Sequence, residues 1–419
     1  MKISTFSAFK SRNYRLYFSG QSVSLIGTWM QKTAVSWVVY AHTHSKFMLG
    51  LTLFASMFPS FILSFLGGIA SDRYNRYKLL LLTQFASMLQ ALALTLLVYF
   101  KHYSVWHIIG LSAVLGVINA FDVPARQSLV YEMVDNKADL PNALALNSSM
   151  VNLSRLIGPG IAGIALEKLG DDICFALNTF SFVAVIVSLL MMKLPAYQPS
   201  NKHKDVLREL KEGLAYVRNT PNISQILSIL GMMSLFVLPF TTLIPVYAKD
   251  IFKGSATTFG VIDSAIGLGA LLGALYLASL KPGRNLRKVL AINTLVFGVG
   301  LVLFSHTTWY PIALFFATLC GFGMMSQITI SNTIIQTTVD PAVRGRVISL
   351  YAMVFFGLQP LGGLLVGAIS QYIGTPDTVL MEGIFTLIVG GYSLRLINKR
   401  EESFIALQEN PQEVRVNSN

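Results

Sequence analysis

The sequence predicts an all-α membrane protein whose twelve transmembrane helices form two related six-helix halves. Of its 419 residues, 53% are hydrophobic and only 12% are charged, whereas an ordinary soluble domain has about 25% charged residues. Apolar runs of about 20 residues recur along nearly the whole chain, and each can cross a hydrocarbon core about 30 Å thick. Short motifs also repeat on either side of a polar stretch near the middle. These observations exclude a water-soluble fold.

The apolar runs define the expected helices and their orientation. The helices are expected near residues 16–40, 47–70, 78–100, 106–130, 141–167, 173–193, 222–248, 258–280, 288–305, 309–338, 343–372 and 378–397. The connections at one end of these helices hold most of the Lys and Arg residues. Those at the other end hold only Lys46, Lys101, Lys168, Lys249 and Lys253. Because basic loops stay in the cytoplasm, we expect both termini there and an even number of spans.

A polar stretch at residues 195–221 separates the two predicted halves. Its leucines at 207, 210 and 214 have the spacing of a short amphipathic helix on the membrane surface. The expected organisation is an N-terminal half at 1–193, a cytoplasmic connection at 194–221, a C-terminal half at 222–397 and a cytoplasmic tail at 398–419. A Val-Asp pair, a helix and a segment of Pro and Gly follow one another in both halves. Two halves of equal topology are related by an axis along the membrane normal.

The junction between the second and third helices carries a charged motif. It reads GGIASDRYNRYK, with Gly68, Asp72, Arg73 and Arg76 at its characteristic positions. This segment resembles motif A of the major facilitator superfamily. We expect Gly68 to permit close helix packing, and Asp72 to meet the positive N-terminus of the eleventh helix near Arg344 as a cytoplasmic latch. The alternative is a positive loop with one incidental Asp, and the second-half copy lacks that Asp.

Further motifs extend the resemblance over nearly the whole chain. They read FDVPARQ at 121–127, RLIGPGIAG at 155–163 and RGRVISLY at 344–351. Together they resemble the enterobactin-exporter and macrolide-efflux branch of the superfamily, the type 3 drug:proton antiporters. The resemblance implies a secondary transporter that exports a siderophore, a drug or a lipid-like metabolite, without a cofactor.

A second short motif lies in the fifth helix. Gly158, Pro159 and Gly163 resemble motif C of antiporters, where Gly and Pro shape a bend and a tight helix contact. The match is partial, because Ile164 stands where a second glycine is usual. A purely structural kink is the alternative. The motif therefore favours export without establishing it.

Charged residues within the predicted spans are the candidates for energy coupling. They are Lys32, Asp122, Arg126, Arg155 and Asp263, and a charge within the bilayer costs several kcal/mol unless it has a partner or a wet cavity. Asp122 could release its ion-pair partner, Arg126 or Arg155, and bind a proton instead. The alternative is a permanent ion pair at the cytoplasmic gate. Asp263 lies on a glycine stripe that suits helix packing, and it is also a candidate proton carrier.

A polar face of the first helix is expected to line a central cavity. Gln21, Ser24, Thr28, Gln31 and Lys32 share this face at 100° per residue. The full set of predicted cavity residues is Thr28, Trp29, Gln31, Lys32, Asn119, Phe240 and Gln327. Lys32 either pairs with a buried carboxylate or meets a polar or anionic substrate.

The remaining features limit the function. The net charge of +12 is scattered through short loops, whereas nucleic-acid binding needs a basic surface patch. Cys174 and Cys320 lie inside apolar segments, which indicates neither a disulfide framework nor a metal site. No nucleotide-binding loop or nucleophile elbow occurs, so we expect no enzyme. The sequence predicts a proton-coupled exporter of a small molecule, working as a monomer by alternating access in the bacterial inner membrane. The alternatives are an uptake symporter or facilitator and a non-transport membrane protein.

Overall fold

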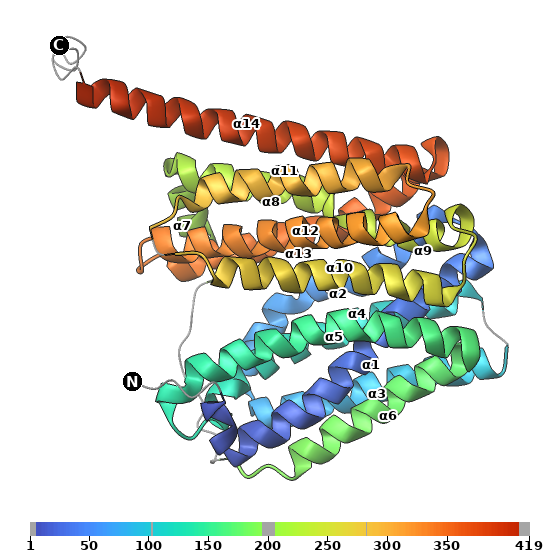
Figure 1. Cartoon of the computed structure of the whole chain (residues 1–419). Helices are drawn as coiled ribbons and strands as arrows, with labels where there is room; N and C mark the ends of the chain where they lie inside the picture. The colour runs from blue at the N-terminus through green and yellow to red at the C-terminus, as the bar shows by residue number, and fades with distance from the viewer. Residues whose placement is uncertain (1–5, 102–103, 195–205, 282, 410–419) are drawn as a thin grey trace.

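The computed structural model describes all residues except 1–5, 102–103, 195–205, 282 and 410–419 (Figure 1). The helices of the first half are α1 (Arg12–Thr43), α2 (Lys46–Arg73), α3 (Arg76–Tyr99), α4 (Val105–Met133), α5 (Leu140–Lys168) and α6 (Asp171–Leu190). The second half has α8 (Pro221–Phe236), the short α9 (Ile244–Val246), α10 (Ala256–Ala278), α11 (Leu286–Ser305), α12 (Tyr310–Thr338), α13 (Arg344–Ile373) and α14 (Thr375–Glu409). A connecting helix, α7, spans Val206–Asn219.

The two halves lie side by side, and the start of α1 and the end of α14 lie at the same end of the bundle. Figure 1 shows α1 to α6 in the lower part of the view and α8 to α14 in the upper part. We call the end that holds the start of α1, the end of α14 and α7 the terminal end, and the opposite end the far end. The α1–α2 and α5–α6 connections lie at the far end.

Eleven helical segments in the described part of the chain are long and apolar enough to cross a membrane. Helix α1 falls outside this set because its polar face lowers its hydropathy. Its 32 residues nevertheless extend about 1.5 Å per residue, which exceeds the bilayer core, and it packs against α5 and α6. It therefore completes the predicted twelve-span bundle.

The seventh span differs from its prediction as one continuous helix at 222–248. Helix α8 ends at Phe236, a 3₁₀ segment covers Leu238–Leu243, and a π-helical turn covers Tyr247–Ile251 after α9. Pro239 and Pro245 explain the break, because proline has no N–H for the helical hydrogen bond and clashes with the preceding turn. We call residues 237–251 the broken segment.

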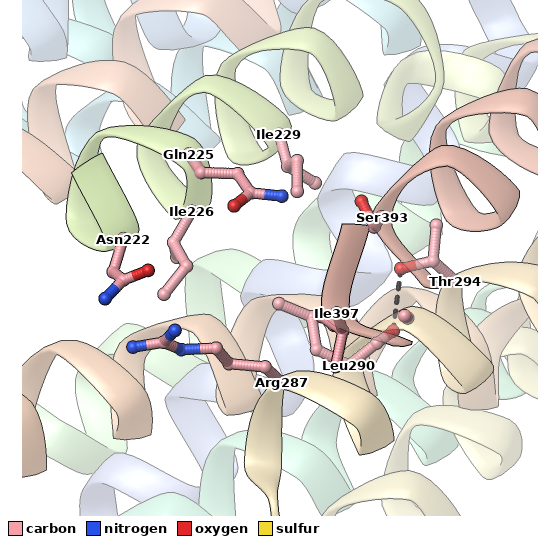
Figure 2. A pocket seen from close by; sticks show the side chains of 10 residues that line it. Asn222, Gln225, Ile226, Ile229, Arg287, Leu290, Thr294, Ser393 and Ile397 are labelled. Atoms are coloured by element: carbon pink, nitrogen blue, oxygen red, sulfur yellow. Dashed lines mark hydrogen bonds between the residues drawn. The ribbon is translucent and has the colours of Figure 1, made fainter. Parts of the chain in front are cut away.

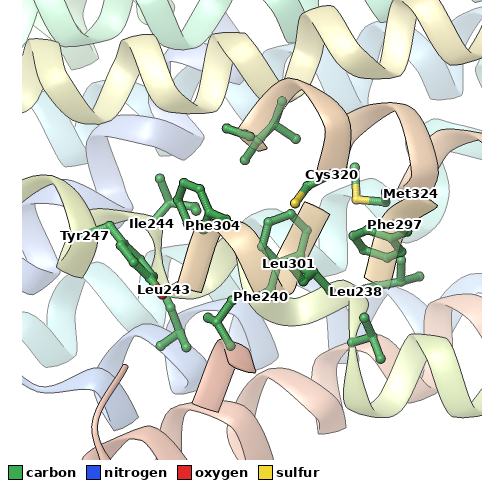
Figure 3. Packing of buried hydrophobic residues seen from close by; sticks show 14 of the residues in the cluster. Leu238, Phe240, Leu243, Ile244, Tyr247, Phe297, Leu301, Phe304, Cys320 and Met324 are labelled. Atoms are coloured by element: carbon green, nitrogen blue, oxygen red, sulfur yellow. The ribbon is translucent and has the colours of Figure 1, made fainter. Parts of the chain in front are cut away.

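The hydrophobic core of the second half surrounds the broken segment (Figure 3). The ring centres of Phe240 and Phe297 lie 5.7 Å apart, and those of Tyr247 and Phe304 lie 4.6 Å apart. The expectation that Phe240 lines a central cavity is wrong for this conformation, because its side chain is only 1% exposed and packs inside this core. An aromatic ring on a span meets lipid, protein or cavity, and the sequence alone did not distinguish them.

The halves touch mainly through two helix pairs, α2 with α13 and α5 with α10. Glycines make both contacts possible. A Cβ atom on Gly163 would lie 2.6 Å from the Ala256 carbonyl oxygen, and one on Gly260 would lie well under 3.0 Å from that of Pro159. A Cβ on Gly50 would likewise collide with the Gly363 carbonyl. All these contacts lie toward the far end.

Two glycines near the terminal ends of α2 and α13 make no such close contact. A Cβ atom built on Gly68 or on Gly345 meets no atom within 4 Å. The two halves are therefore packed tightly against each other at the far end, and these positions at the terminal end have open space around them.

Candidate functional site

Three charged side chains from the two halves gather where α1, α5 and α10 meet. They are Lys32, Arg155 and Asp263, and the charge of Asp263 interacts with both cations. The Lys32 Nζ lies 4.8 Å and the Arg155 Cζ 5.5 Å from the centre of the Trp29 ring. Among the described residues, none of the three charged groups forms an ion pair within 4.0 Å. We call Trp29, Lys32, Arg155 and Asp263 the central cluster.

Helix spacing and glycines explain why these side chains meet. Trp29 and Lys32 are three residues apart and therefore share one face of α1. A Cβ atom on Gly158 would lie 2.5 Å from the Trp29 Cβ. Arg155 lies three residues before Gly158, so the face of α5 that packs on Trp29 also carries the guanidinium.

Helix α10 brings the carboxylate to the cluster through its own glycines. A Cβ atom on Gly267 would lie 2.8 Å from the Arg155 carbonyl oxygen, which shows how closely the backbones approach. Asp263 lies one helical turn before Gly267, and the hydroxyl of Thr33 donates to its Oδ2 across 3.4 Å. The glycine stripe thus packs the helices together and turns Asp263 toward α1.

The central cluster borders open space although it lies deep within the bundle. Lys32 is exposed to solvent, while Trp29, Arg155 and Asp263 are half-buried. Lys32 lies twenty residues after the start of α1, about 30 Å along its axis. The glycine contacts pack the two halves together at the far end, and we infer that access to Lys32 runs from the terminal end.

Polar contacts reinforce the closed far end. The Tyr40 hydroxyl donates to the carboxylate of Asp250, and the Lys46 Nζ donates to the Ser370 carbonyl across 2.9 Å. Glu167 of α5 accepts from the Ser255 hydroxyl at the start of α10. Each bond joins one half to the other. The sequence reasoning missed them, because partners more than 80 residues apart leave no local signal.

Asp122 lies elsewhere, inside the first half. Its Oδ1 accepts from Thr83 at 2.9 Å and from Gln84 at 2.6 Å, and its Oδ2 pairs with Arg126 at 3.0 Å. Arg155 instead lies on Trp29, and its NH2 is 3.8 Å from the Met324 Sδ. In this conformation Asp122 pairs with Arg126 and not with Arg155. Exchange of this partner for a proton stays a prediction, as does the alternative of a permanent ion pair.

Asp122→Asn should lower the thermal unfolding midpoint of the protein in detergent. The half-buried guanidinium of Arg126 would lose its carboxylate. Breaking one side of a fully buried ion pair costs about 3–5 kcal/mol, so we expect a smaller loss here. Asp72→Asn is the matched control, because Asp72 is exposed. The double variant Asp122→Asn with Arg126→Gln should recover part of the loss. An unchanged midpoint, combined with lost pH-gradient-driven transport, would instead give Asp122 a titrating role.

The amide side chains of Gln31 and Gln327, which were predicted to line the cavity, instead point into the interior of their own halves. Gln31 is buried, donates to Gln90 across 3.0 Å and accepts from Asn178 across 2.7 Å. Gln327 is fully buried and accepts from Thr294 across 2.7 Å. The expectation that both face the cavity is wrong for this conformation, because both side chains are buried and bond to neighbouring helices. The Nε2 of Gln327 has no hydrogen-bond partner among the described residues.

The positions of the other two predicted cavity residues, Thr28 and Asn119, do not decide whether they line a cavity. The hydroxyl of Thr28 donates to the Ser24 carbonyl of its own helix across 2.9 Å. Asn119 is half-buried on α4. Of the predicted cavity set, Trp29 and Lys32 are the two that belong to the central cluster.

The motif between α2 and α3 makes contacts that differ from those expected. Gly67, not Gly68, provides the close approach, because its Cβ would collide with the Ala120 carbonyl of α4. Arg76 pairs with Glu132 at 2.8 Å and with Asp72 at 3.8 Å, while Arg73 is exposed. Arg346 pairs with Glu212 of α7 at 2.9 Å. A latch between Asp72 and the start of α13 stays a prediction.

Gly67→Ala should destabilise the protein, and Gly68→Ala should not. The first substitution forces a methyl group onto a backbone carbonyl, while the second adds a better helix former in open space and can stabilise by up to about 1 kcal/mol. Thermal midpoints of the two purified variants in detergent would test this. Equal midpoints would contradict the close packing of α2 on α4.

A small pocket lies inside the second half, away from the central cluster. Figure 2 shows that Asn222 and Gln225 of α8, Arg287 of α11 and Ser393 of α14 contribute to its lining. None of the charged residues of the central cluster contributes to it. In the described part of the chain, no three His, Cys, Asp or Glu residues are grouped to hold a metal ion.

The sequence reasoning also missed Glu382 on α14. Its side chain is 5% exposed, and its two carboxylate oxygens have no hydrogen-bond partner. A signal was present, since Glu382 is the single charged residue between Asp377 and Arg395 in the last predicted span.

Comparisons with known proteins identify the family of the chain. The family model described as transmembrane secretion effector matches residues 3–417. The staphyloferrin A transporter of Staphylococcus aureus is 26% identical over 393 residues, covering 90% of this chain and 94% of that protein. The multidrug efflux pump Tap of Mycolicibacterium fortuitum is 24% identical, covering 88% and 91%. The enterobactin exporter EntS of Shigella boydii is 24% identical, covering 90% of each.

Solved structures share the fold. A bacterial homologue of the human lysosomal transporter Spinster, in an inward-facing and unoccupied conformation, has a TM-score of 0.73 at 11% identity, covering 93% of this chain and 97% of that chain. A mutant of the nucleoside transporter NupG has a TM-score of 0.70 at 11% identity, covering 92% and 99%. With the family model matching almost the entire sequence, the chain belongs to the transmembrane secretion effector family, a group of efflux-type transporters of the major facilitator superfamily.

Proposed function

We propose that this protein is a proton-driven exporter of a small polar amphiphile and that the central cluster binds substrate and proton in turn. The observation that carries the proposal is the set of unpaired charges between the halves. Lys32 and Arg155 from the first half face Asp263 from the second half without direct ion pairing. In major facilitator transporters the substrate site lies at the interface of the halves near the midplane.

The chemistry of the cluster suits a ligand that carries both an acidic group and a hydrogen-bond donor. Lys32 and Arg155 supply donors and positive charge, Asp263 supplies an acceptor, and Trp29 supplies a flat apolar face. A carboxylate-bearing siderophore with hydroxyl groups has this combination. The staphyloferrin A transporter is one of the relatives, which supports this substrate class over a purely apolar drug.

Competition at Asp263 gives the proposed coupling. The ionised carboxylate accepts hydrogen bonds from a donor of the substrate. A proton on Asp263 removes both the negative charge and part of this acceptor capacity, so proton and substrate exclude each other. Such exclusion is what an antiporter needs, because each ligand then carries the protein through one direction of the cycle.

The closed far end supports the direction of transport. If the basic connections keep the terminal end in the cytoplasm of a bacterial inner membrane, Lys32 is reached from the cytoplasm in the conformation described. We propose that the protein loads substrate in this conformation as a monomer. It would then exchange the substrate for a proton after the far end opens.

Transport into inverted membrane vesicles tests the function. Vesicles that contain the protein should accumulate staphyloferrin A when their interior is acidified, and vesicles without it should not. Erythromycin, a macrolide, serves as the comparison probe and distinguishes a drug pump from a siderophore exporter. Accumulation of staphyloferrin A inside right-side-out cells, in the direction of proton entry, would make the protein an uptake symporter instead.

A further inference from the structure

The second half contains a buried carboxylic acid that the proposed mechanism does not use. Glu382 lies near the start of α14, its side chain is 5% exposed, and both of its oxygens lack a hydrogen-bond partner in the structure. The adjacent Gly383 packs tightly on α11, since its Cβ would lie 2.8 Å from side-chain and backbone atoms of Val302. This tight contact holds the carboxyl group inside the half.

Among the described residues, no Lys, Arg or His forms an ion pair with Glu382 within 4.0 Å. Tyr247 of the broken segment and Cys320 of α12 are the titratable groups that sense its charge. The Tyr247 hydroxyl is already donated to the Ser305 carbonyl across 2.8 Å. On its own helix, Asp377 is exposed and lies 3.2 Å from the imidazole of His306.

The helices of the second half around Glu382 also have long stretches without basic residues. Residues 221–236, 289–305, 310–338 and 375–394 contain no Lys and no Arg. An ionised carboxylate without a partner in a membrane interior costs several kcal/mol or more. A carboxylic acid in such a place avoids this cost by keeping its proton.

The position of Glu382 connects it to the contacts that close the far end. Tyr247 begins the π-helical turn Tyr247–Ile251, and this turn also contains Lys249 and Asp250. Asp250 accepts from Tyr40 of α1, and the Lys249 Nζ donates to the Ala41 carbonyl across 3.4 Å. Opening the far end must break these bonds and move the turn that begins at Tyr247, whose hydroxyl senses the charge of Glu382.

We propose that Glu382 is a second proton-carrying residue, which holds a proton while the far end is closed and releases it when the far end opens. Movement of the broken segment admits water to the carboxyl group, and water stabilises the ionised form. The proton state of Glu382 and the state of the far end are then linked, and each shifts the other by the same free energy. The inference rests on alternating access but not on the identity of the substrate.

The test uses the full-length protein in lipid nanodiscs without substrate. Cysteines replace Leu169 and Trp309, which are exposed at the far end of the first and second halves, and carry spin labels. Pulsed electron resonance then measures the distance between the labels as the pH is varied. We expect the open population to increase with pH in the otherwise native protein, and Glu382→Gln to remain closed at every pH. Asp377→Asn, a neighbouring carboxylate on the same helix, should respond like the native protein.

Infrared spectroscopy reports the proton directly. The native protein should show the carbonyl band of a protonated carboxylic acid that disappears in Glu382→Gln and persists in Asp377→Asn. Glu382→Asp keeps the acid and should keep a pH response, which separates loss of the proton site from a folding defect. An unchanged pH response in Glu382→Gln, or an infrared band unaffected by it, would overturn the inference.

The outcomes also separate this inference from the proposed function. A pH response that Asp263→Asn removes and Glu382→Gln leaves intact would keep the central cluster and exclude Glu382. A pH response lost in Glu382→Gln, together with no transport of staphyloferrin A in vesicles, would keep Glu382 and reject the proposed function.

Discussion

Asp263→Asn should abolish transport driven by a pH gradient while leaving exchange of substrate across the membrane intact. The asparagine keeps the size of the side chain and can still accept from Thr33, but it carries no charge and binds no proton. Substrate would then cross in both directions without being driven. Staphyloferrin A accumulation in acidified inverted vesicles should fall to the level of vesicles without the protein, and counterflow at equal pH should continue.

A matched control isolates the charge from the local hydrogen bond. Thr33→Val removes the 3.4 Å bond to Asp263 and leaves the carboxylate, so gradient-driven transport should persist. Full gradient-driven accumulation in Asp263→Asn would remove Asp263 from the coupling role. Asp122→Asn would then be the next variant to measure in the same assay.

Gly260→Leu should prevent the far end from closing. A Cβ atom at this position already lies well under 3.0 Å from the Pro159 carbonyl oxygen, a rigid backbone atom of the opposite half. Leucine is a better helix former than glycine, so a loss of function would come from the contact and not from the helix. The distance between labels at Leu169 and Trp309 should lengthen in the whole population, and transport should fall to background.

The control for this variant is Gly110→Leu. Gly110 lies on α4, and a Cβ built there meets no atom within 4 Å. Its label distance and transport should match those of the native protein. A Gly260→Leu variant that still closes would show that α5 and α10 can separate without loss, and that the polar bonds of Tyr40 and Lys46 suffice to close the far end.

The sequence predicted the helices well because hydrophobic length is a local property. Each predicted span corresponds to a helical segment. The break at residues 237–251 follows from Pro239 and Pro245, and a hydropathy profile does not include the effect of proline on the backbone. Hydropathy measures whether a segment can cross the membrane. It does not report whether the backbone stays helical on the way.

The central cluster was predicted in part, and Gln31 and Lys32 show why. These neighbours differ by 100° around α1, and a polar face is wide enough to include both. Partners on other helices decided the outcome, since Gln90 and Asn178 take Gln31 into the first half. Lys32 has no such partner there and faces Asp263, more than 200 residues away in the sequence, without direct ion pairing.

Asp263 also shows how two readings of one residue can both hold. Its glycine stripe indicated packing, and its charge indicated coupling. Gly260 and Gly267 do pack on α5, and the same close contact brings the carboxylate to the cations. Spacing on one helix identified the glycine stripe. A single sequence did not show which helix packs against that stripe.

The polar bonds of the first half have a consequence for inhibition. Gln31, Asp122 and Arg76 each tie two or three helices of that half together, whereas the second half contains the broken segment with its interrupted backbone bonding. We therefore expect bending during the rocking of the halves to concentrate at residues 237–251. A molecule wedged against that segment would stop the cycle at any substrate concentration, because it would not compete for the central cluster.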